Sequence, residues 1–85
     1  MQLARYFAVG VGHAPDGRFV AAGKCDEQLS ELSAVRKARA LAYRTGGAVA
    51  FRWRGDVEFG CPGSIEILAG FGELPSEVER IIRET

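Results

Sequence analysis

The sequence predicts an α+β fold in which two strands, a helix, two more strands and a second helix follow one another (ββαββα). Segments near both ends alternate with the period of a β-strand, and a central segment has the three-four spacing of a helix. Glycine and proline residues separate these segments. We expect a four-stranded, mostly antiparallel sheet with one long helix packed on one face and a short C-terminal helix. Since a domain usually has roughly 100–200 residues, we expect one small domain over residues 1–85.

The first two strands are predicted to form a hairpin. Residues 3–11 alternate, so that Leu3, Phe7, Val9 and Val11 lie on one face and Ala4, Tyr6 and Ala8 on the other. Pro15-Asp16-Gly17 follows, and this is turn chemistry because proline presets φ and glycine tolerates positive φ. Residues 18–23 are predicted to be the second strand. The polar residues 24–32 are expected to lead into a helix.

A helix is predicted from the region of Leu32 to Thr45. Its apolar stripe is Leu32, Val35, Ala38, Leu41, Ala42 and Thr45. Ser30 or Asp26 is the expected N-cap, because a short polar side chain there accepts a backbone N–H. The pair Gly46-Gly47 is expected to end the helix, since glycine readily takes the left-handed conformation.

The third and fourth strands are predicted over residues 48–53 and 64–70, and a terminal helix follows Pro75. In the third strand, Val49, Phe51 and Trp53 share one face, and Ala48, Ala50, Arg52 and Arg54 share the other. We expect the aromatic face to pack on the long helix. The apolar stripe of the terminal helix is Val78, Ile81 and Ile82.

Charge is unevenly distributed although the net charge is zero. Residues 30–54 carry six cations and one anion, whereas residues 55–85 carry two cations and seven anions. The six cations are the candidate contacts for a nucleic acid or another anion: Arg36, Lys37, Arg39, Arg44, Arg52 and Arg54. Contacts to phosphate without contacts to bases predict non-specific, salt-sensitive binding. The alternative is that these side chains face solvent or pair within the fold.

The face opposite the aromatic residues is rich in small side chains. A solvent-facing sheet normally carries polar residues there, whereas small apolar residues permit the close approach of another layer. The candidate self-association face consists of Ala4, Ala8, Ala48 and Ala50. The covering layer is expected to be either the terminal helix or a second copy, because two-fold homodimers are the commonest soluble oligomers. We therefore expect a homodimer.

Reactive side chains are few. Cys25 and Cys61 lie far apart in no motif, and His13 is the sole histidine, so we expect no metal site and no cofactor. The two cysteines are expected to be reduced thiols of a cytoplasmic protein. No apolar run approaches the roughly 18 residues that a membrane span needs. Nine arginines against two lysines indicate a GC-rich bacterial genome.

These observations favour a non-catalytic interaction or accessory protein that self-associates and could also bind a protein partner. The first alternative is non-specific nucleic-acid binding through the basic helix and strand of residues 36–54. The second is a small thiol-dependent enzyme that uses Cys25, Cys61 or His13, although the sequence supplies no catalytic base at a known spacing.

Overall fold

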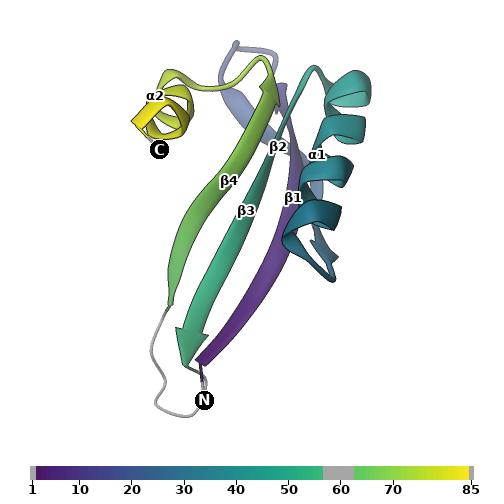
Figure 1. Cartoon of the computed structure of the whole chain (residues 1–85). Helices are drawn as coiled ribbons and strands as arrows, with labels where there is room; N and C mark the ends of the chain where they lie inside the picture. The colour runs from purple at the N-terminus through teal and green to yellow at the C-terminus, as the bar shows by residue number, and fades with distance from the viewer. Residues whose placement is uncertain (1, 57–62, 85) are drawn as a thin grey trace.

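A computed structural model describes residues 2–56 and 63–84 of the chain. The chain forms six elements in the predicted order ββαββα, so the fold class is confirmed. Figure 1 shows their arrangement. The elements are β1 (Gln2–His13), β2 (Phe19–Gln28), α1 (Glu31–Thr45), β3 (Gly47–Asp56), β4 (Ser64–Gly72) and α2 (Ser76–Glu84).

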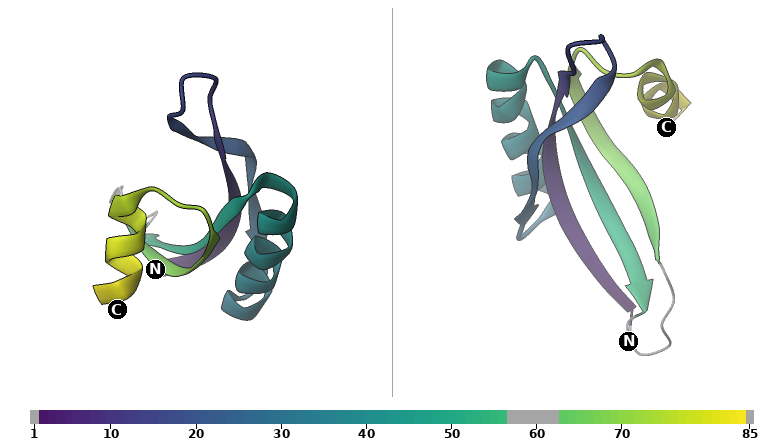
Figure 2. Two further views of the ribbon diagram at one scale, coloured as in Figure 1. Left: turned by 90° about the horizontal axis from the view of Figure 1, so that it is seen from above. Right: turned by 180° about the vertical axis from the view of Figure 1, so that it is seen from behind.

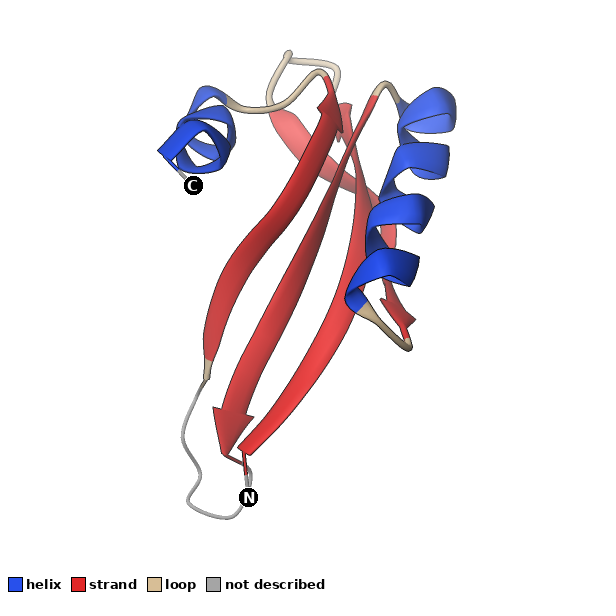
Figure 3. Cartoon of the chain, in the orientation of Figure 1, coloured by secondary structure: helices blue, strands red, loops and turns tan. Residues whose placement is uncertain are grey.

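The four strands form one sheet in the order β2-β1-β3-β4, in which all neighbours are antiparallel (Figure 3). The long strand β1 lies in the interior of the sheet and pairs with β3 in unbroken register from Gln2 opposite Asp56 to Val11 opposite Gly47. Helix α1 connects β2 to β3, which lie on either side of β1. The unbroken register between β1 and β3 determines which of their side chains share a face.

The predicted hairpin turn is confirmed, but the second strand is longer than predicted. Gly17 has φ +88°, and the N–H of Arg18 donates to Asp16 Oδ1 over 3.1 Å. Strand β2 then continues to Gln28, so the polar residues 24–28 are strand and not the approach to a helix. They remain in the sheet because β1 extends far enough to pair with them, with Tyr6 opposite Gln28. The ladder bonds outweigh the weak strand propensity of polar residues.

Helix α1 has the caps that the sequence predicts. The Ser30 hydroxyl oxygen accepts a hydrogen bond from the N–H of Ser33 over 3.1 Å, so Ser30 is the N-cap and Asp26 is not. Gly46 is left-handed with φ +94°, and its N–H donates to the carbonyl of Ala42. These two contacts satisfy backbone groups that a helix end leaves without partners.

Helix α1 packs on the small-residue face of the sheet and not on the aromatic face, so that expectation is wrong. Ala34 and Ala38 of the helix lie against Ala8, Ala48 and Ala50 of the sheet, and all five are completely buried. The predicted stripe is shifted, because Ala34 is buried and Leu32 is 59% exposed. Short side chains on both surfaces let the helix approach the sheet closely, which the bulkier aromatic face would not allow.

Helix α2 lies on the other face of the sheet, near the end of β4. A Cβ added to Gly70 would collide with Ile82 and Leu74, and Gly70 pairs with Val49 on that same face. Figure 2 (left) shows the two helices on opposite sides of the upper end of the sheet. Over the described ranges, neither helix has the length and apolar character needed to cross a membrane.

Candidate functional site: an open apolar sheet face

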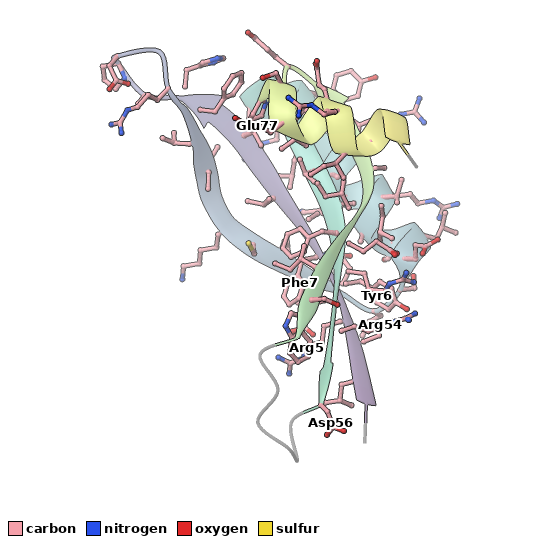
Figure 4. All side chains as sticks on the ribbon, turned by 90° about the vertical axis from the view of Figure 1, so that its left-hand side faces the viewer. Arg5, Tyr6, Phe7, Arg54, Asp56 and Glu77 are labelled. Atoms are coloured by element: carbon pink, nitrogen blue, oxygen red, sulfur yellow. The ribbon has the colours of Figure 1, made fainter. Side chains whose placement is uncertain are left out.

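The sheet face opposite α1 carries a cluster of large apolar side chains that this helix does not cover, and we call it the open face. Its apolar side chains are Leu3, Phe7, Val9, Val11, Val49, Phe51, Trp53, Ile65 and Ile67, and Arg5 lies on the same face opposite Trp53. Strand alternation and register place them together, because residues opposite each other in a ladder share a face. Figure 4 shows Phe7 and Tyr6 of β1 pointing to opposite sides, with Tyr6 on the side of α1.

Aromatic rings hold the middle and the lower end of the open face in place. Phe7 and Phe51 stack across β1 and β3 with their ring centroids 5.2 Å apart and an interplanar angle of 19°. The indole of Trp53 lies over two glycines, Gly55 and Gly63, where any Cβ would collide with the ring. These close contacts therefore fix the positions of the aromatic rings on the open face.

Helix α2 covers only the upper end of this face. Val49 and Leu74 are buried there, whereas Ile65 toward the other end is 67% exposed and Leu3 is 37% exposed. No side chain larger than alanine is completely buried among the described residues. The large apolar side chains that usually fill a core are thus gathered on a face that remains partly in water.

The chain exposes more surface than a compact monomer of its size. Its accessible area is 5907 Å², whereas a monomer of 9.2 kDa is expected to expose about 4,900 Å². Its radius of gyration is 13.3 Å, against about 12 Å expected for 85 residues. The chain is therefore less compact than an average monomer of this size.

The predicted self-association face needs correction. Ala8, Ala48 and Ala50 are completely buried under α1, so they are not available to a second copy. Ala4 is exposed beyond the end of the helix. The element that packs on Ala8, Ala48 and Ala50 is therefore α1 of the same chain. It is neither α2 nor a second copy.

The structure separates the six predicted anion contacts into two groups. Lys37 pairs with Asp26 at 3.4 Å, and Arg52 pairs with Glu66 and with Glu31, so these two cations already have acidic partners. Within the described part of the chain, the other four form no ion pair; they are Arg36, Arg39, Arg44 and Arg54. Three of them lie on α1, and Arg54 lies separately near the end of β3.

The proposed reactive residues are not assembled into one site. His13 lies 3.7 Å from Glu73 and against the ring of Phe19, which is opposite it in the hairpin. Cys25 is an exposed free thiol six residues further along β2, roughly 20 Å away at the rise of a strand. Cys61 lies outside the described residues. Over residues 2–56 and 63–84, no group of three or more potential ligands is close enough together to hold a metal ion.

The comparisons with known proteins give no relative from which a role could be transferred. No family model matches the sequence, and neither a curated protein nor a solved structure is significantly similar to it. The chain is therefore defined by its own architecture: a ββαββα domain with an alanine-packed helix on one side of the sheet and a partly covered apolar face on the other.

The sequence predicts a common face for the open-face side chains of β1 and β3, but it also predicts that this face packs on the long helix. The size of the side chains on the long helix indicates which face of the sheet packs against it. The two fully buried residues of α1 are alanines, Ala34 and Ala38, and such short side chains fit a surface of equally short side chains. The aromatic face then has no long helix to cover it.

Proposed function

We propose that this protein is a non-catalytic interaction protein of the bacterial cytoplasm that self-associates as a homodimer through its open face. The observation that supports this most directly is the apolar face itself. Antiparallel sheets that face water normally carry polar residues on that side, whereas this one carries Phe7, Phe51 and Trp53. Contiguous apolar surface of this kind is typical of interaction sites.

A second copy is the partner that we propose for this surface, because two-fold homodimers are the commonest soluble oligomers. The charged Arg5 of the open face pairs with Glu27 of β2 at 3.4 Å, so its charge is balanced within the same subunit. This pair therefore does not by itself oppose the meeting of two open faces. A sandwich of two sheets is a common way to bury such faces.

The exposed free thiol of Cys25 supports the cytoplasmic part of the proposal. Thiols remain reduced in the cytosol, whereas secreted proteins of this size usually pair their cysteines.

The test is the mass of the full chain as a function of concentration, measured by sedimentation equilibrium. The wild type is expected to approach twice 9.2 kDa. Ile65→Lys places a charge on the open face at a side chain that is 67% exposed, so the subunit itself should fold. Burying that unpaired charge in an interface is costly, and the dimer dissociation constant should rise at least about tenfold.

Leu29→Lys is the matched control, because it makes the same chemical change at a fully exposed leucine outside the open face. This variant should dimerise like the wild type, and circular dichroism should show that both variants are folded. A wild type that stays monomeric at every concentration, or two variants with the same dissociation constant, would overturn the proposal.

A further inference from the structure

Helix α1 presents three arginines and a tyrosine to solvent. Arg36, Arg39 and Arg44 are exposed and form no ion pair with any residue that the structure describes. Tyr43 is 85% exposed. The span from Arg36 to Arg44 is about 12 Å at the rise of an α-helix. This surface is locally positive although the whole chain is neutral, so it attracts anions.

A groove of about 280 Å³ opens beside these residues, between α1 and the end of β4. It is lined by Arg39, Ala42, Tyr43, Phe71 and Gly72. Gly72 has φ +73°, and a Cβ there would collide with the carbonyl oxygen of Gly46. The glycine therefore lets β4 end close against the helix. The groove has two aromatic rings and one guanidinium in its lining.

We propose that this surface binds single-stranded nucleic acid, with a base in the groove and phosphates on the exposed arginines of α1. Stacking on an aromatic ring combined with cations along the backbone is how proteins hold single strands. The groove is slightly smaller than the roughly 300–1,000 Å³ of pockets for drug-sized ligands, which suits one planar ring. A base in a duplex is stacked and paired, so it does not enter such a groove.

An acidic peptide is the competing occupant, since it also satisfies arginines. It supplies no planar ring for Tyr43 and Phe71. The aromatic lining of the groove therefore favours nucleic acid, and the contribution of Tyr43 distinguishes the two occupants.

This surface lies on the opposite side of the sheet from the open face, so the inference stands independently of self-association. The experiment is fluorescence anisotropy of labelled single-stranded DNA and RNA oligonucleotides titrated with the full chain at several salt concentrations. Wild-type affinity should fall as salt rises. The slope of log affinity against log salt is negative, and Arg39→Ala should make it less steep by about 0.7, the value expected for one phosphate contact on a single strand.

Tyr43→Ala should weaken binding about tenfold or more, because stacking on a ring is lost. Arg80→Ala is the matched control, since it removes an exposed arginine of α2 and should leave both affinity and slope unchanged. Duplex of the same length should bind more weakly than the single strand.

Three outcomes would overturn the inference. One is the absence of binding at low salt. The second is equal weakening by Arg39→Ala and Arg80→Ala, which would mean attraction without a site. The third is displacement of the oligonucleotide by poly-glutamate together with no effect of Tyr43→Ala, which would show a surface for acidic chains.

Discussion

The indole of Trp53 lies so close over Gly55 that a methyl group added to the glycine would stand 2.5 Å from the ring atom Cζ2. Gly55→Ala should therefore displace the ring or the strand and lower the free energy of unfolding by about 1–3 kcal/mol, as overpacking usually does. Urea denaturation followed by Trp53 fluorescence, at one protein concentration, measures this loss. Gly12→Ala is the control, because its Cβ would meet Ala22 at an ordinary 3.7 Å. Its effect should remain within about 0.5 kcal/mol.

The close packing of α1 on the sheet predicts that enlarging two alanines of this helix changes stability by different amounts. Ala38 is completely buried against the sheet, whereas Ala40 faces solvent. Ala38→Leu should push the helix outward and destabilise the fold by about 1–3 kcal/mol, while Ala40→Leu should change stability by less than about 0.5 kcal/mol. Thermal or urea unfolding of both variants checks this. The reverse order would mean that α1 packs through its other side.

The N-cap of α1 is a further point at which one atom matters. Ser30→Ala removes the oxygen that accepts the N–H of Ser33, and it should cost about 1 kcal/mol of stability. Ser30→Asp keeps an acceptor in place and should restore most of the loss. Urea unfolding of the two variants tests the cap, and an equal loss in both would contradict it.

Arg52 joins three elements, because it pairs with Glu66 on β4 and with Glu31 at the start of α1. A double-mutant cycle with Arg52→Ala and Glu66→Ala should give a coupling energy of about 0.5–1 kcal/mol that decreases as salt is added. Arg54→Ala, two residues along the same strand, is the control because Arg54 forms no ion pair in the described residues. A coupling energy that does not respond to salt would argue for packing and not charge.

Much of the architecture could be predicted because it depends on local chemistry. Gly17 and Gly46 require positive φ, Ser30 supplies a short polar side chain, and strand alternation assigned the faces of β1 and β3 correctly. The end of β2 could not be predicted in this way. Residues 24–28 remain in the sheet because of the length of β1, and that is a property of the partner strand rather than of the segment.

The error about the packed face has a physical origin. Apolar area alone favours burying Phe51 and Trp53, and this led to the expectation that they meet the helix. Shape decided the outcome instead, since α1 offers mainly alanines and fits the equally short residues Ala48 and Ala50. The groove beside Tyr43 depends on where β4 ends in space, which no spacing in the sequence reveals.

The placement of α1 and the open face on opposite sides of one sheet has a consequence for any assembly. If two copies join through their open faces and α1 binds single strands, the two α1 helices become the outermost layers and their exposed sides face away from each other. Such a particle could not close both basic helices around one strand as a clamp does. It would instead hold two separate strands apart at a fixed spacing and so act as a bridge between them.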